Sequence, residues 1–420
     1  MNHIFKKIIV VMLFITLKPV SSYSLSINEL MIITNENSLI IQADLEYLKK
    51  FQNDIELAKK NNDPSITLSG FVGAKHQETD SSEASFNPRN LKLTMSKNLF
   101  DGYKTKYSIL QANDLSLQAD YLFEALKQNV YLESISSYLD LIHLRQSYDL
   151  TEQNLKLSKS NLDFKVQQHS SGDISDIELE KAKLEYSKYE FSLKKIQISI
   201  SDQEDLILDY MSTVPSVNKY PEIMDRNIDL SLEALIEFAI NNNPSIKSSQ
   251  IYLKILEHSK MIERSANLPK VNLEAGYSRN WDATDSAGQA DEYSIIGSIS
   301  IPLYESEEVN IKESNIDLDI IRNDKILKDQ INNLKREINS LLDQIELLNT
   351  EYEIENNQKE IYEKDIEIKE ESYNLGSSSK LDIYDSQIKY NEHLISMAQI
   401  MNSKQKAHYL LLNKIGKLTQ

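Results

Sequence analysis

The chain has 420 residues, a formal net charge of -18 and no cysteine. The missing cysteine excludes disulfides, thiolate metal sites, cysteine nucleophiles and a lipid anchor on an N-terminal cysteine. The acidic balance makes nucleic acid a poor candidate ligand, and nine glycines with eight prolines are too few for a row of ordinary domains.

The first 24 residues predict a secretory signal peptide. Lys6 and Lys7 precede an apolar run from Ile8 to Leu17, and small residues follow up to Ser24. This run is shorter than the roughly 18 residues of a membrane-spanning helix, and no later stretch approaches that length. We therefore expect residues 1–24 to be removed, and any membrane-embedded part of the mature chain to be built from strands.

The remaining sequence repeats itself with an offset of about 204 residues. Gly172 corresponds to Gly376, and "NLFDG" at 98–102 corresponds to "PLYES" at 302–306. "DPSITLSGF" from Asp63 likewise corresponds to "LPKVNLEAGY" from Leu268. These matches predict a duplicated half-protein, with a first repeat over 25–214, a linker over 215–230 and a second repeat over 231–420.

Each repeat begins with a predicted helical stretch, over 27–61 and over 231–266, followed by two strands. "SITLSGFVGAKH" alternates apolar and polar residues, as does "VNLEAGYSRNW", and "LKLTMS" and "YSIIGSISI" are the return strands. The segments between them, "QETDSSEASFNPRN" and "DATDSAGQADE", are predicted to be polar, flexible loops. Trp281 ends a strand, where an aromatic ring favours a membrane interface.

A very long helix, a glycine break and another helix follow in each repeat. No glycine or proline occurs between Tyr103 and Ser171 or between Leu303 and Leu375, so each run could reach roughly 100 Å at about 1.5 Å per residue. The second run carries a heptad seam at Leu327, Ile331, Leu334, Ile338, Leu341, Ile345 and Leu348. This pattern favours a cylinder of side-by-side helices, and it is equally compatible with a solid coiled coil.

The four strands constrain the assembly. Each has about 10 to 12 residues, which suits a tilted strand crossing a bilayer. Lipid offers no hydrogen-bond partners to open edges, so the sheet must close across several copies of the chain. Two copies would supply eight strands and three would supply twelve, and the strands alone leave this number open.

The chain resembles the TolC-type outer membrane factors. The resemblance is carried by the duplicated order of elements, "NLFDG", "NPSI" at 243–246 and "YNLGSSSKLDIYDSQIKY" at 373–390. It implies an α+β membrane protein in which four strands per chain contribute to a trimeric, twelve-stranded outer-membrane β-barrel, continued by a long periplasmic α-helical barrel. It also implies the outer membrane of a Gram-negative bacterium, with most of the mass in the periplasm.

The implied function is a passive exit duct for a tripartite efflux pump or a type I secretion system. The implied partners are two further copies of the chain, outer membrane lipid, a periplasmic adaptor, and an inner-membrane transporter of the RND or ABC class. The transported substrate does not follow from the resemblance, since the transporter selects it. The alternative is a soluble periplasmic coiled-coil adaptor or scaffold without a pore, which would not need two equivalent strand pairs.

The resemblance also assigns roles at the periplasmic entrance, near the helix-turn glycines Gly172 and Gly376. By position, Asp382 and Asp385 match acidic residues that ring this entrance, and spacing of three puts both on one helix face. Asp382 is equally explained as a helix cap, because Ser379 precedes it by three residues.

A second implied feature of the entrance is a tie that holds it shut. Tyr373 aligns with the tyrosine of this tie and Glu178 with its acidic partner, and a tyrosine can hydrogen-bond a carboxylate. The arginine of a second family tie is replaced by Ser378, so we expect closure to use fewer or different contacts here.

Enzymatic motifs are missing from the sequence. Seven histidines are scattered along it, and none forms an H-E-x-x-H pair or a metal cluster. Neither a glycine-rich phosphate loop nor a G-x-S-x-G elbow occurs. The sequence therefore predicts no catalytic residue, no metal site and no cofactor.

Overall fold

The computed structural model describes residues 25–79, 82–217, 219–223, 231–282, 288–303 and 307–419. The predicted signal peptide lies outside the described residues, as do residues 218 and 224–230 of the predicted linker, so both remain predictions. The chain divides into two compact units. Met1–Ile33, Ser136–Met224 and Ile354–Asn402 form the first unit, and Thr34–Ile135, Asp225–Glu353 and Ser403–Gln420 form the second.

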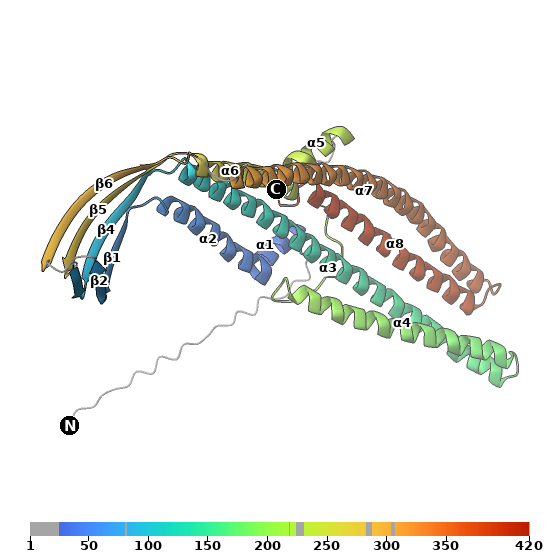
Figure 1. The fold of residues 1–420 in the computed structure, drawn as a ribbon. Helices are drawn as coiled ribbons and strands as arrows, with labels where there is room; N and C mark the ends of the chain where they lie inside the picture. Colours follow the sequence, from blue (N-terminus) through green and yellow to red (C-terminus); the bar gives the residue numbers. More distant parts are fainter. Residues whose placement is uncertain are drawn as a thin grey trace, which may run out of the picture. The chain divides into compact units, whose positions relative to one another are not determined.

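The elements repeat in the order that the sequence predicts (Figure 1). The first half contains α1 (Ile27–Asn37), α2 (Leu39–Lys60), α3 (Lys104–Ser170) and α4 (Asp176–Leu208). The second half contains α5 (Leu232–Asn242), α6 (Pro244–Arg264), α7 (Glu308–Asn374) and α8 (Lys380–Lys414). α3 and α7 have 67 residues each, so the predicted duplication and the two uninterrupted helices are confirmed.

The helical stretches predicted over 27–61 and 231–266 are each two helices. Asn243 has extended backbone angles, and its side chain accepts hydrogen bonds from the amides of Ser245 and Ile246, at 3.0 and 3.2 Å. Pro244 explains this break, because a proline disfavours the helical conformation of the residue before it and suits the first position of a new helix. Ser38 is also extended and separates α1 from α2.

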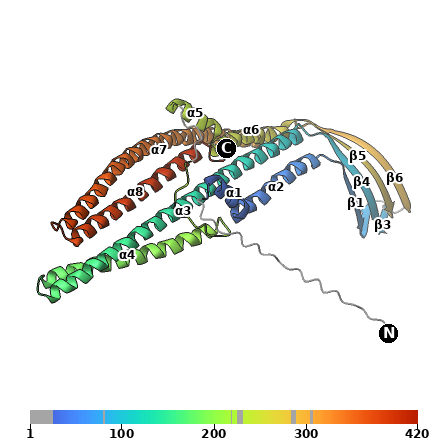
Figure 2. The ribbon, with the colours of Figure 1, turned by 180° about the vertical axis from the view of Figure 1, so that it is seen from behind.

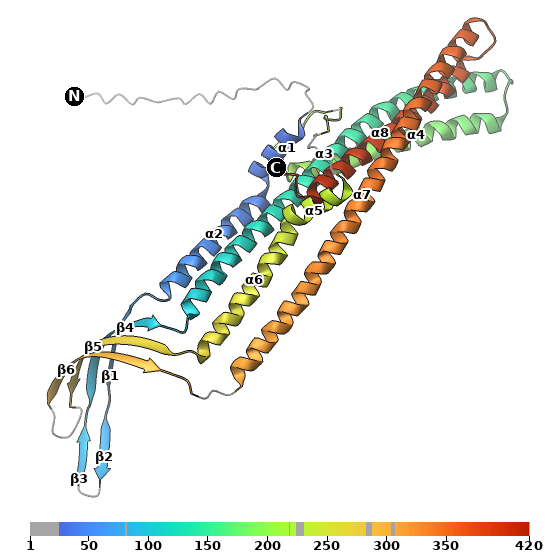
Figure 3. The ribbon, with the colours of Figure 1, turned by 90° about the horizontal axis from the view of Figure 1, so that it is seen from above.

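The strand pairs of the two halves join in one antiparallel sheet. β1 (Ser65–Val72), β4 (Arg89–Phe100), β5 (Lys270–Trp281) and β6 (Gln289–Ser300) lie in the order β1-β4-β5-β6. The loop predicted over "QETDSSEASFNPRN" is only partly a loop. It contributes to a second hairpin, β2 (Lys75–Thr79) with β3 (Ser82–Phe86), which extends beyond β1 and β4 (Figure 3). The two strands are held by hydrogen bonds between backbone groups, which do not depend on the side chains. Its mostly polar sequence therefore gave no sign of a strand pair.

The junction between β4 and α3 explains the glycine of "NLFDG". Gly102 has a φ of +69°, and a Cβ built on it would lie 2.6 Å from the carbonyl oxygen of Ser265 and 2.8 Å from Cβ of Leu268. Asp101 caps α3 by accepting hydrogen bonds from the amide and the hydroxyl of Thr105, at 2.8 and 2.5 Å. Only glycine combines this backbone conformation with this close approach.

Each unit has its own buried side chains. In the first unit Tyr138 is fully buried and its hydroxyl donates to the carbonyl of Leu25 at 3.0 Å. In the second unit, four residues of the predicted heptad seam of α7 are buried, namely Leu334, Ile338, Leu341 and Leu348. Within the described ranges, none of the helices combines the length and the apolarity needed to cross a membrane.

Candidate functional site

The two turns that end the long helices, where α3 meets α4 and α7 meets α8, lie in the first unit (Figure 1, Figure 2). Gly172 has a φ of +84° and Gly376 a φ of +75°. At each turn the glycine amide donates to the carbonyl three residues back, and the next amide donates to the carbonyl five residues back, at 2.9 to 3.0 Å. These are Schellman motifs, in which a left-handed glycine satisfies the last carbonyls of a helix.

The helices restart with matching caps. The hydroxyl of Ser175 accepts from the amide of Glu178, and that of Ser379 from the amide of Asp382, both at 3.3 Å. The carboxylate of Asp382 in turn accepts from the amide of Ser379 at 2.8 Å and from the hydroxyl of Ser378 at 2.9 Å. The reciprocal bonds between Ser379 and Asp382 form a capping box, and the bonds that the carboxylate accepts lower the pKa of Asp382. A role in an acidic ring stays a prediction.

Asp385 lies one turn further into α8 and caps nothing. Its side chain is exposed, and partial desolvation nevertheless raises its pKa. Lys389 and Lys165 act in the opposite direction, while the negative charge of Asp382 adds to the rise. Burial thus outweighs the two lysines, and the Asp385 carboxyl holds its proton more tightly than a free carboxyl does.

A carboxylate cluster between α4 and α8 includes Asp385. The hydroxyl of Tyr189 donates to Oε1 of Glu392 at 2.7 Å, and burial together with this bond raises the pKa of the Tyr189 phenol. Burial, followed by the charges of Asp385 and Glu392, raises the pKa of Glu185. Glu185 and Glu392 were not singled out from the sequence.

The predicted tie between Tyr373 and Glu178 is not made within this single chain. Among the described residues, no hydrogen bond joins the two side chains, and 45% of Tyr373 is exposed. The tie stays a prediction.

Other contacts join α7 to α8 instead. The Ser386 hydroxyl donates to Asp365 at 2.6 Å, and the Tyr390 hydroxyl donates to Glu363 at 2.8 Å. Burial and this bond raise the pKa of Tyr390 to about 12. Sequence reasoning missed both pairs, although the members of each lie at nearly equal distances on either side of Gly376, which is the signal that identifies facing positions in a helical hairpin.

A buried amide pair joins α3 to α8. Nδ2 of Asn391 donates to Oδ1 of Asn154 at 2.8 Å, and both side chains are buried. Buried polar groups need partners, so this pair fixes which residues of the two helices lie opposite each other.

The four-stranded sheet has one apolar and one polar face. The strand register brings Ile66, Met95, Ala275 and Ile295 into one row and Leu68, Leu93, Tyr277 and Tyr293 into the next, which together we call the apolar face. The opposite rows, called the polar face, are mostly polar, with Phe71 and Ile296 as large apolar exceptions, and contain Ser65, Thr67, Ser69, Lys92, Thr94, Ser96, Glu274, Ser278 and Ser294. Every residue of β1 is exposed, so neither face of this strand is covered.

The apolar face ends in aromatic and charged residues near the loops. The rings of Tyr277 and Tyr293 lie 4.9 Å apart, and Arg279 forms a bidentate ion pair with Asp291, at 2.6 and 3.0 Å. Trp281 lies at the same end of β5. Such an order, apolar rows followed by aromatic and charged residues, is typical of strands that face lipid.

The first unit has two exposed stripes of apolar side chains, and within each stripe the residues are spaced seven positions apart. The α4 stripe consists of Ile177, Leu184, Phe191 and Ile198, which are 55% to 70% exposed. The α7 stripe consists of Ile354, Ile361, Ile368 and Leu375, which are 59% to 85% exposed. A heptad period is typical of helices that pack along their length, so both stripes lack a partner in the single chain.

A family model described as "Outer membrane efflux protein" matches the chain twice, over 34–195 and over 235–416. A comparison with curated protein sequences finds no significant match. Among solved structures, a membrane protein from Pseudomonas aeruginosa has a TM-score of 0.80 at 13% identity, with 94% of this chain and 91% of that chain covered.

Two structures described as outer membrane channels are also similar. The CmeC channel of Campylobacter jejuni has a TM-score of 0.78 at 13% identity, with 93% of this chain and 86% of that chain covered. The open state of the MtrE channel of Neisseria gonorrhoeae has a TM-score of 0.74 at 13% identity, with 96% and 94% covered. At this identity the similarity shows a shared fold.

Proposed function

Because this chain belongs to the outer membrane efflux protein family, we propose that it is the outer-membrane exit duct of a tripartite efflux pump or a type I secretion system. In this role it passively conducts substrates that an inner-membrane RND or ABC transporter and a periplasmic adaptor deliver. Most of its mass, the helices, lies in the periplasm. The two-faced sheet is the observation that carries the proposal.

The sheet has the chemistry of a channel wall. Its apolar face suits lipid, and its polar face, with serines, threonines and the Lys92–Glu274 ion pair at 3.2 Å, suits water. β1 and β6 are its edges and would leave unpaired amides and carbonyls in the membrane. Pairing β6 of one copy with β1 of the next satisfies both edges, and three copies complete a twelve-stranded barrel.

The α4 and α7 stripes support the same assembly. α7 runs toward its glycine turn and α4 runs away from its own, so with the turns at one end of the assembly the two helices are antiparallel. Ile177 then faces Leu375, and the next pairs follow at intervals of seven residues, with Leu184 opposite Ile368 and Ile198 opposite Ile354. One register thus matches all four pairs, between α4 of one copy and α7 of the next.

The turns near Gly172 and Gly376 then form the periplasmic entrance. Three copies of Asp385, with Asp382 at the start of the same helix, would place a ring of carboxylates there and favour cations. Tyr373 and Glu178 would form a closing tie in the assembled duct. This role requires no catalytic residue, and we assign no enzymatic activity to the chain.

A soluble adaptor or scaffold without a pore is not supported. Family membership argues against it, and such a protein would gain nothing from an exposed four-stranded sheet with an uncovered apolar face.

Cysteine cross-linking tests the assembly directly, because the natural chain has no cysteine. The variant with Leu184→Cys and Ile368→Cys should give a covalent trimer on non-reducing gels of outer membranes, since the two positions face each other across the interface. The control with Leu184→Cys and Ile361→Cys shifts one partner by about 10 Å along α7, beyond the reach of a disulfide. A ladder that stops at the dimer, or recovery of a soluble monomer, contradicts the proposal.

A further inference from the structure

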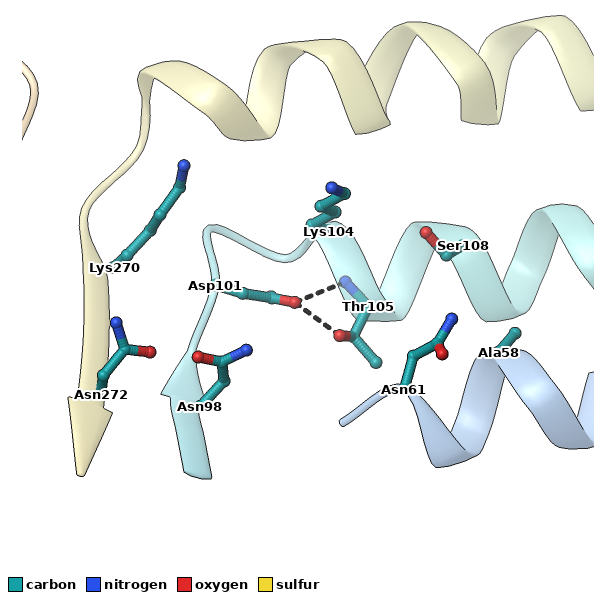
Figure 4. A pocket seen from close by; sticks show the side chains of 9 residues that line it. All are labelled: Ala58, Asn61, Asn98, Asp101, Lys104, Thr105, Ser108, Lys270 and Asn272. Carbon is teal, nitrogen blue, oxygen red and sulfur yellow. Dashed lines mark hydrogen bonds between the residues drawn. The ribbon is translucent and has the colours of Figure 1, made fainter. Parts of the chain in front are cut away.

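A pocket of about 410 Å³ lies in the second unit, where β4 and β5 meet the helices. Figure 4 shows its lining side chains, which come from the end of α2, the ends of β4 and β5 and the first turns of α3. They are Ala58, Asn61, Asn98, Asp101, Lys104, Thr105, Ser108, Lys270 and Asn272. Apart from Ala58, every lining residue is polar or charged.

Two of these residues are lysines without a protein partner. In the part of the chain that the structure describes, the side-chain ammonium groups of Lys104 and Lys270 make neither a hydrogen bond nor an ion pair. Some lysines of this unit have a carboxylate partner, as Lys260 has in Asp317 at 2.6 Å and Lys92 has in Glu274 at 3.2 Å. The pocket instead brings together two ammonium groups that no described carboxylate neutralises, in a chain with a net charge of -18.

The one acid of the pocket does not neutralise these lysines. Oδ2 of Asp101 accepts from the amide and the hydroxyl of Thr105, as the dashed lines in Figure 4 mark. Its carboxylate thereby satisfies the first turn of α3, whose dipole favours negative charge at this end. Asp101 acts as a helix cap and forms no ion pair with Lys104 or Lys270.

Neutral donors complete the lining. The side chains of Asn61, Asn98 and Asn272 have no hydrogen-bond partner among the described residues. Asn98 and Asn272 are neighbours in the strand register and continue the polar face beyond Ser96 and Glu274. A ligand in this pocket would thus meet two positive charges and several free amide donors, on the face of the sheet that suits water.

We propose that this pocket binds the anionic group of a soluble solute, a carboxylate or a phosphate. Lys104 and Lys270 supply the charge, and the three asparagines donate hydrogen bonds to its oxygens. Its location inside the duct rests on the proposed function, because it follows from the polar face being the water-filled side. The duct would then hold an anion-binding site where its strands meet its helices.

Inorganic phosphate titrated into the purified, detergent-solubilised protein tests binding without any pore measurement. Broadening of the phosphorus NMR signal should saturate for the natural chain. The affinity should fall about fivefold in Lys104→Gln and in Lys270→Gln, since a charge pair about 4 Å apart in water contributes about 1 kcal/mol. Lys92→Gln is the matched control, because it removes a lysine of the polar face that already has a carboxylate partner.

The same variants in planar bilayers test the location. Phosphate should reduce single-channel conductance in the natural chain and in Lys92→Gln, and much less in the variant lacking both Lys104 and Lys270. Equal phosphate binding in all variants overturns the site. The site is also overturned if free phosphate has no effect and the protein instead binds phosphatidylglycerol vesicles, with this binding lost when both Lys104 and Lys270 are replaced. A conducting pore that ignores phosphate refutes this inference alone, whereas a protein that forms no pore refutes the proposed function.

Discussion

Replacing Gly102 with alanine should destabilise the protein more than replacing Gly376, and the structure supplies the reason. Both glycines have left-handed backbones, with φ values of +69° and +75°. At Gly376 an added Cβ meets nothing within 4 Å, whereas at Gly102 it would lie 2.6 Å from the carbonyl oxygen of Ser265 and 2.8 Å from Cβ of Leu268. The pair therefore separates backbone strain from steric clash.

The magnitude follows from these two terms. A non-glycine residue in the left-handed conformation costs roughly 1–2 kcal/mol, and this applies at both positions. The clash adds roughly 1–3 kcal/mol at Gly102 only, because a carbonyl oxygen and a Cβ cannot rotate away. We expect a loss in the free energy of unfolding of about 2–5 kcal/mol for Gly102→Ala and about 1–2 kcal/mol for Gly376→Ala.

Thermal denaturation followed by circular dichroism at one detergent concentration measures the difference. Gly172→Ala is the control, since Gly172 is left-handed and its surroundings are also empty, so it should behave like Gly376→Ala. Equal midpoints for Gly102→Ala and the other two variants would refute the close approach at the junction of β4 and α3.

Three further predictions concern the first unit. Asp385→Asn should lower cation preference in planar bilayers. Burial raises the pKa of Asp385 above 3.8, so the contribution of this carboxyl to stability is present at low pH and is lost as pH rises through the raised pKa. The denaturation midpoint of Asp385→Asn should therefore depend less on pH than that of the natural chain. Asn391→Leu should cost about 1–3 kcal/mol of stability by leaving the Asn154 carbonyl buried without a donor, whereas the variant with Asn154→Leu as well should recover most of it in the same denaturation assay. Tyr373→Phe should raise the conductance of the resting channel, and an unchanged conductance would remove the case for the Tyr373 tie.

The sequence predicts most of the fold because duplication and long-range periodicity are carried by many residues at once. Gly172 and Gly376 mark both turns, and uninterrupted runs without glycine or proline predict two 67-residue helices. The breaks at Ser38 and Asn243 were missed, since each depends on one local conformation within an otherwise helical pattern. The β2–β3 hairpin was missed because its polar residues lack apolar alternation.

The site was less predictable than the fold. Asp382 could be assigned as a cap from its spacing to Ser379, whereas the cluster around Glu185 and Glu392 depends on which faces of α4 and α8 meet. The pocket at Lys104 and Lys270 joins residues more than a hundred positions apart. No local pattern marks such a site, since it arises from the way the two halves of the duplication share one sheet.

The equal length of α3 and α7 restricts how this chain can evolve. A residue inserted into α3 alone would rotate everything beyond it by about 100° and move its turn away from the turn after α7. Duct length should therefore change among descendants only in whole heptads, gained or lost in both halves and in the helices that return from the turns. The duplication therefore couples the two halves, because the helix length of each half limits the helix length of the other.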